Sequence, residues 1–121
     1  MANITLEQLK NNSDCIIDLC NKFKIDATKL RIYGEILGPN SYKGKQSDLN
    51  FLSDEPLALT TKMAFERELA NKLIENGIFC SIQLVTVDQL KENLFPKIYQ
   101  QVIMETVFIN DLPKNCCSLN L

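Results

Sequence analysis

Two residues with oxygen-bearing side chains, Asp48 and Asn50, follow a turn-rich loop near the middle of the chain. They stand in a predicted strand, 48–52, which is preceded by a short apolar strand, 30–33, and by Gly34. An aspartate is a usual ligand of Mg²⁺, whereas an asparagine offers a neutral oxygen without charge. The residues also allow simpler interpretations: Gly34 ends a strand in a tight turn, Asp48 is an exposed or turn-forming acid, and Asn50 lies on a solvated strand face.

The loop before Asp48 is a second candidate for chemistry. Residues 42–45 read Y-K-G-K, which could contact phosphate or RNA through charge and stacking, or could be an ordinary solvated loop. No glycine-rich loop with a Lys-Ser/Thr ending precedes a helix, so a P-loop is excluded. The net charge of −2 makes nucleic acid an unfavourable partner for the whole molecule.

Composition limits the class of protein further. The 121 residues suit one domain, with 45% hydrophobic and 23% charged residues, as in ordinary globular proteins. The absence of histidine removes His-based triads and imidazole acid–base catalysis. No apolar run is long enough for a membrane span and no secretory signal is recognisable, so we expect a cytoplasmic protein without a membrane partner. Cys15, Cys20 and Cys80 are expected to be small core residues, and Cys116-Cys117 has no assigned role.

The hydrophobic pattern predicts an alternation of helices and strands. Thr5 and Gln8 form a capping box that starts a helix over 5–23. A second, longer helix follows Pro56 and ends at Asn76, where Gly77 is a suitable C-terminal cap. The β-branched segment 78–87 predicts a central strand, Asp88 a helix cap, and Pro96 the start of a last helix before V-F-I at 107–109.

This order predicts an α+β fold, a small mixed β-sheet flanked by helices. The first two strands are joined by a loop and should be antiparallel neighbours, and the third follows a helical crossover and should run parallel to one of them. We assign residues 1–110 to the domain and 111–121 to a C-terminal tail, in which fraying is expected.

The element order and the segment K-L-R-I-Y-G-E-I-L-G-P, followed by S-D-L-N-F, resemble the minimal nucleotidyltransferase domains of the DNA polymerase β superfamily. The closing K-I-Y-Q-Q-V-I-M-E-T-V-F-I is similar to the last helix of that family. The resemblance implies a nucleotidyltransferase-like fold over nearly the whole chain. In the family a Gly-Ser turn holds a nucleoside triphosphate, and an Asp-x-Asp pair with a third carboxylate holds the metal.

Carried onto this chain, the resemblance places nucleotide binding at Gly34 and Glu35, with Glu35 in place of the serine. Asp48 matches the first metal-binding aspartate, and Asn50 and Gln83 stand where the family has its other two carboxylates. These three are the degenerate catalytic positions, and Asp48 is the one implied metal ligand. The arginine that usually follows the Gly-Ser turn has no counterpart.

The substitutions weaken the chemistry that the family performs. Two Mg²⁺ ions normally clamp the attacking and leaving oxygens, and amides replace two of the three carboxylates that would hold them. Gln83 cannot accept a proton, and the loss of general-base help alone typically costs ~10²–10⁴ in rate. Glu35 adds a negative charge near the expected triphosphate. Binding of Mg²⁺ and ATP is therefore expected to be weak or absent.

Two functions follow from the resemblance. One is a catalytically degenerate domain that binds a protein partner, such as the antitoxin or regulatory subunit of a helical ribonuclease-type toxin. An apolar face of the last helix, Ile98, Val102 and Ile103, could supply the interface or could be buried in the domain's own core. The alternative is an active Mg²⁺-dependent enzyme that transfers AMP from ATP, with Glu35 or Asp54 as substitute carboxylates. A homo-oligomer is compatible with both.

Overall fold

The computed structural model describes residues 4–37 and 48–112. The helices in these ranges are α1 (Leu6–Asn11), α2 (Ser13–Lys22), α3 (Leu59–Glu75), α4 (Val87–Asn93) and α5 (Pro96–Met104). The strands are β1 (Leu30–Tyr33), β2 (Asp48–Ser53), β3 (Ser81–Thr86) and β4 (Val107–Phe108). Single turns of 3₁₀ helix occupy Ala27–Lys29, Glu35–Leu37 and Ile109–Asp111.

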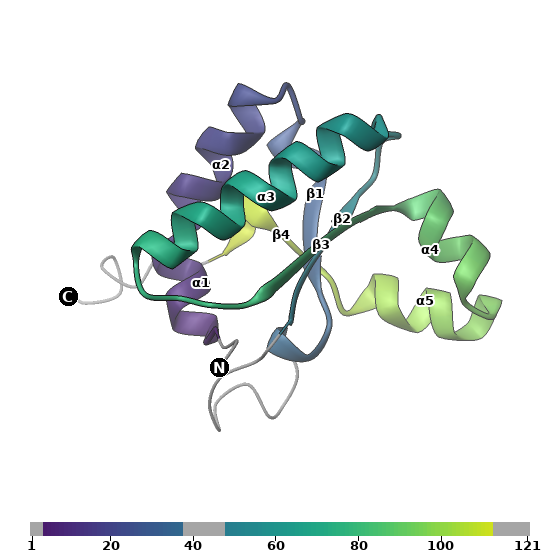
Figure 1. Ribbon diagram of the computed structural model, residues 1–121. Coiled ribbons are helices and arrows are strands. Elements are labelled where there is room, and N and C mark those ends of the chain that lie inside the picture. The colour runs from purple at the N-terminus through teal and green to yellow at the C-terminus, as the bar shows by residue number, and fades with distance from the viewer. Residues whose placement is uncertain (1–3, 38–47, 113–121) are drawn as a thin grey trace.

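The strands form one mixed sheet in the order β3-β2-β1-β4 (Figure 1). β1 is antiparallel to β2 and to β4, whereas β2 and β3 are parallel and are connected through α3. This confirms the predicted α+β class, the antiparallel pairing of the first two strands and the parallel third strand. β3 lies at the edge of the sheet rather than at its centre, because no strand pairs with its other side among the described residues.

The core lies between one face of the sheet and helices α1, α2 and α3. Alternate residues of β2, Leu49 and Phe51, are fully buried on this face. The Phe51 ring meets the ring of Phe65 on α3 edge to face, with centroids 5.4 Å apart. A continuous cluster includes residues from all three helices and three strands: Leu9, Ile16, Leu19, Cys20, Leu30, Ile32, Leu49, Phe51, Phe65, Leu69, Leu73 and Leu84.

The opposite face of the sheet has less cover. Leu52 on β2 and Leu90 on α4 are buried but lie outside the main cluster, and α4 packs against β3. The pair α4 and α5 extends to one side of the sheet (Figure 1). α5 begins at Pro96, as predicted, and no residue of this helix is fully buried.

Two helix predictions differ from the structure, one in the continuity of a helix and one in the residue that caps it. The helix expected over 5–23 is interrupted at Asn12, where the side-chain Nδ2 donates to the Gln8 carbonyl at 2.8 Å. Asparagine competes with backbone hydrogen bonds in this manner and favours a break. α4 is capped by Thr86 in a capping box with Gln89, so Asp88 lies in the first turn and is not the cap. The Thr5–Gln8 capping box is confirmed.

The packed part of the chain continues slightly past the predicted domain boundary. Ile109, the first residue of the 3₁₀ turn at Ile109–Asp111, and Leu112, which follows this turn, are both buried in the main cluster. Leu112 therefore belongs to the domain rather than to the tail. Among the described residues, no helix has the length and apolar character needed to cross a bilayer.

Candidate functional site

Sheet register brings the predicted polar residues together on one face. Asn50 on β2 is directly opposite Gln83 on β3 and Tyr33 on β1, so the three form a row across the sheet. Asp48 precedes Asn50 by two positions and is opposite Ser81, which places it on the same face one row away. Because Leu49 and Phe51 face the helical layer, this row faces away from α2 and α3.

Gly34 lies at the end of β1, beside the same row. Its φ is +101°, a conformation that residues with a side chain rarely adopt. A Cβ added at this position would lie 2.9 Å from Nδ2 of Asn50. The turn after β1 thus passes close to the Asn50 amide. Glu35 begins the 3₁₀ turn that follows; the description covers its backbone and not its side chain.

The donor set on this face is one carboxylate and two amides. Asp48 and Gln83 are exposed and Asn50 is half-buried. Burial raises the pKa of the neighbouring Cys80 thiol to about 11, and the negative charge of Asp48 adds to this shift. Among the described residues, no group of three His, Cys, Asp or Glu side chains is close enough to hold a metal ion. The arrangement can bind a polar ligand through amide and hydroxyl groups, but it offers a cation a single charge.

Asp54 cannot serve as a substitute carboxylate in this row. It lies six residues beyond Asp48, about 20 Å along an extended strand. Its two carboxylate oxygens accept hydrogen bonds from Nε and Nη2 of Arg31 at 2.8 and 3.0 Å. The guanidinium also donates to Oγ1 of Thr106 at 3.0 Å and lies 4.4 Å from the ring centre of Phe108. Asp54 therefore belongs to a structural cluster, which we call the Arg31 clamp.

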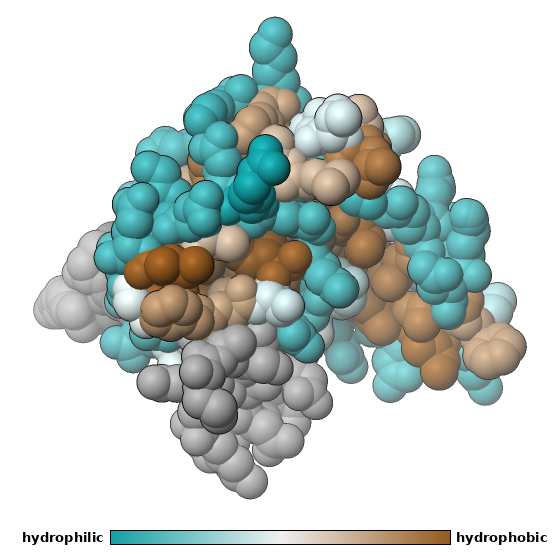
Figure 2. Space-filling view, viewed as in Figure 1, coloured by the Kyte–Doolittle hydropathy of each residue, from teal (hydrophilic) through white to brown (hydrophobic). Residues whose placement is uncertain are grey.

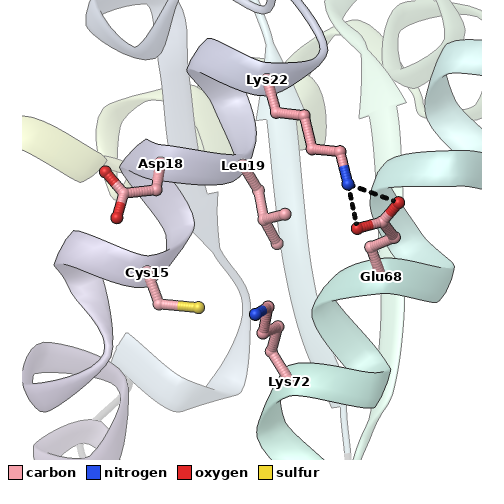
Figure 3. Close-up of a pocket in the computed structure, with 6 residues that line it drawn as sticks. All are labelled: Cys15, Asp18, Leu19, Lys22, Glu68 and Lys72. Atoms are coloured by element: carbon pink, nitrogen blue, oxygen red, sulfur yellow. Dashed lines mark hydrogen bonds and ion pairs between the residues drawn. The ribbon is translucent and has the colours of Figure 1, made fainter.

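Two grooves were not predicted from the sequence. The first, of about 450 Å³, lies between α2 and α3 (Figure 3) and is lined by Cys15, Asp18, Leu19, Lys22, Glu68 and Lys72. Lys22 pairs with Glu68 at 2.8 Å across it. Burial raises the pKa of the Cys15 thiol, partly offset by the charge of Lys72. Its charges are mixed and partly paired, which makes it a solvated helix junction rather than a site for a defined ligand.

The second groove, of about 330 Å³, lies between α4 and α5 and is lined by Lys91, Leu94, Pro96, Tyr99 and Gln100. Beside it, Phe95 is 79% exposed and Ile98 is 48% exposed, while Val102 and Ile103 are half-buried. The predicted apolar face of the last helix is thus only partly covered by the chain itself. In Figure 2, hydrophobic side chains are visible on the part of the molecule formed by these two helices.

The sequence contained signals for some of these features and not for others. The pairing of Asn50 with Gln83 joins residues on either side of a helical crossover, and only the resemblance connected them. The Arg31 clamp brings together positions from β1, the end of β2 and β4, for which no local motif exists. The basic loop at 42–45 lies outside the described residues.

Comparison with known proteins gives no relative for this chain. No protein-family model, no curated protein and no solved structure matches it.

Proposed function

We propose that this chain is a catalytically degenerate nucleotidyltransferase-like domain that acts by binding a protein partner. The observation that carries the proposal is the donor set on the open sheet face, where Asn50 and Gln83 lie side by side and Asp48 supplies the one carboxylate. Neutral amides bind the edges of polar groups but cannot neutralise two Mg²⁺ ions. The partner class implied by the resemblance is a helical ribonuclease-type toxin, with this chain as antitoxin.

The apolar side chains on α5 support the partner-binding part of the proposal. Phe95, Ile98 and Val102 recur at helical spacing, and the first two are substantially exposed. α5 contains one charged residue, Lys97, so this helix could pack against an apolar helix of another protein with little desolvation of charge. A helix-in-groove or helix-on-helix contact is the mode that these residues fit.

Restoring the missing carboxylates tests the degenerate-site argument. The double variant Asn50→Asp/Gln83→Glu should gain Mg²⁺ binding in the millimolar range, measured by isothermal titration calorimetry, because three carboxylates would then share one face. The matched control makes the same residue changes at exposed positions on two helices, Asn21→Asp on α2 and Gln101→Glu on α5, and should gain nothing. Wild-type protein that binds Mg²⁺–ATP at millimolar concentration, with binding lost in Asp48→Ala, would instead support the active-enzyme alternative.

The partner contact is tested separately with the protein encoded next to this chain. Co-expression and affinity purification should recover a complex, and Ile98→Asp should weaken it at least about tenfold by placing a charge in the apolar contact. Gln100→Asp, at an exposed position about 160° around the same helix from Ile98, is the control. A complex that forms equally well with Ile98→Asp would exclude α5 as the interface.

A further inference from the structure

One flank of α3 exposes apolar side chains beside the free edge of the sheet. β3 is the edge strand, and the Glu66 carboxylate on α3 accepts a hydrogen bond from the backbone N–H of Leu84 on β3 at 2.8 Å. This hydrogen bond shows which side of α3 lies next to the free edge of β3. Figure 1 shows α3 and β3 side by side at the front of the molecule. Exposed apolar residues on this side of α3 are Leu59 at 65%, Met63 at 55% and Ile74 at 47%.

Helical geometry shows that these residues form one stripe. At about 100° per residue, the positions 59, 63, 66, 70 and 74 fall within about 80° of arc. The stripe therefore contains Leu59, Met63 and Glu66 in the first half of the helix and Ala70 and Ile74 in the second. Arg67 lies at the border of the stripe and has no hydrogen-bond or ion-pair partner within the described part of the chain.

The stripe is self-complementary about its midpoint. Leu59 and Ile74 are equally distant from the point between Glu66 and Arg67, and so are Met63 and Ala70. If two copies of α3 pack antiparallel about this point, each large residue meets a complementary apolar residue, and Glu66 of each copy meets Arg67 of the other. An unrelated partner would require no such symmetry in this chain.

The middle of the edge strand β3 lies beside the midpoint of the α3 stripe. β3 spans 81–86, and the Glu66–Leu84 hydrogen bond places the middle of the strand next to the middle of α3. One twofold axis can therefore relate both elements. Figure 2, which views this face, shows hydrophobic surface toward both ends of α3 with hydrophilic side chains between them. Phe79, 50% exposed, precedes β3 and extends the apolar surface at one end.

From these observations we infer that a second copy of this chain binds to the α3 flank and the β3 edge as an isologous dimer. In the dimer, the Glu66 carboxylate pairs with Arg67 of the second copy and no longer accepts the backbone N–H of Leu84. The N–H of Leu84 donates instead to a backbone carbonyl on β3 of the second copy. The unoccupied edge is protected in the monomer because Glu66 and Gln89 accept the N–H groups of Leu84 and Thr86. This inference does not depend on the proposed function.

Charge reversal gives a specific test. In Arg67→Glu, Glu66 and residue 67 of two copies repel each other at both symmetry-related positions, and in Glu66→Arg the same positions carry two positive charges. Wild type should sediment near twice its chain mass of 13.8 kDa in analytical ultracentrifugation, and each variant alone should dimerise at least about tenfold more weakly. An equimolar mixture should restore the dimer as a heterodimer, because both pairs are then of opposite sign.

Two further variants keep the test decisive. Lys97→Glu makes the same type of charge change on α5 and should leave the dimer unchanged. Met63→Glu, at an exposed position where folding is not at risk, should also prevent dimerisation and replaces Glu66→Arg if that variant fails to fold. A wild-type chain that is monomeric at about 100 μM, far above typical dimer dissociation constants, or an Arg67→Glu variant that dimerises normally, would overturn the inference.

Discussion

Gly34 is the residue where local backbone geometry and the candidate site meet. Its φ of +101° lies well away from the regions open to residues with a side chain, and the nearest atom to an added Cβ is the Asn50 amide nitrogen at 2.9 Å. Gly77, which ends the turn after α3, also has a positive φ of +76° but has open space around it. The two glycines therefore separate the cost of backbone conformation from the cost of crowding.

We expect Gly34→Ala to lower the free energy of unfolding by about 1–3 kcal/mol, more than Gly77→Ala, which should cost about 1 kcal/mol. Both substitutions destabilise the fold because alanine rarely adopts a positive φ, and only Gly34→Ala also displaces the Asn50 side chain. Urea denaturation of the two variants measures the difference. Adding Asn50→Ala to Gly34→Ala removes the crowding, so the excess cost should shrink; equal costs for the two glycines would show that the turn does not press on Asn50.

At the residue scale, Asp48, Asn50 and Gln83 could be predicted as site residues, whereas Tyr33, which lies opposite Asn50 in the same row, could not. Asp48 and Asn50 are a polar pair two positions apart in one predicted strand. Gln83 is a single polar residue in an otherwise apolar segment, and no neighbouring residue in the sequence indicates a site there. What makes Gln83 a neighbour of Asn50 is the parallel register of β2 and β3. The register of two strands depends on which of their residues are buried on the opposite face. Because this burial involves side chains from the whole core, the register cannot be predicted from either strand alone.

At the scale of elements, the Arg31 clamp links β1 to the end of β2 and to β4 on the face of the sheet opposite the main core. Arg31 on β1 reaches Asp54 after β2, and it also reaches Thr106 and Phe108 around β4. The Arg31 and Asp54 side chains are only 19% and 28% exposed, so the paired charges are partly shielded from water. A bidentate, partly buried pair of this kind contributes more than an exposed one.

We expect Arg31→Lys to destabilise the fold by about 1–2 kcal/mol, because lysine keeps the charge but loses the bidentate bond and the ring contact. The nearby Lys29–Glu55 pair, with side chains 47% and 46% exposed, is the comparison, and Lys29→Met should destabilise the fold less than Arg31→Lys does. A double-mutant cycle of Arg31→Lys and Asp54→Asn, followed by urea denaturation, measures the coupling. Coupling no larger than that of Lys29 with Glu55 would mean that the clamp is not a structural link.

The elements themselves could be predicted where periodicity was strong. The strand at 30–33, the strand predicted at 48–52, which is one residue longer in the structure, and the helix that ends before Gly77 follow from apolar spacing and terminal residues. The break at Asn12 and the pairing of β4 with β1 could not be predicted, for different reasons. The break at Asn12 results from its side chain competing with the backbone for a hydrogen bond. The pairing of β4 involves only two of its residues and a strand far away in the sequence, so no local pattern indicates it.

At the scale of the whole molecule, the absence of histidine determines how stability responds to pH. No side chain with an ordinary pKa near neutrality is present, so folding should not change the number of bound side-chain protons between about pH 6 and 8. Outside this window, the groups that matter have shifted pKa values. A side-chain hydrogen bond from Thr28, followed by the backbone bond from the same residue, lowers the pKa of Asp26. Burial raises the pKa of Cys20 to about 12.

Because of these two shifts, the free energy of unfolding should decrease both at acidic pH and at alkaline pH. Asp26 contributes stability above its ordinary pKa of 3.8, and that contribution is lost as the pH falls through its lower value in the folded protein. Cys20 contributes stability that is fully present below its ordinary pKa of 9.0, because both states then hold the thiol proton. Between pH 9 and about 12 the unfolded chain loses this proton first, so stability falls as the pH rises.

We therefore expect a free energy of unfolding that is flat from about pH 6 to 8 and declines above about pH 9. Cys20→Ala should lower stability at neutral pH, since it leaves a gap in the core, and should reduce the alkaline slope. Ile16→Val, which also shortens a fully buried side chain of α2, is the matched control and should keep the wild-type slope. Urea denaturation at fixed pH values from 5 to 10.5 gives both quantities; an unchanged alkaline slope in Cys20→Ala would show that another group takes up the proton.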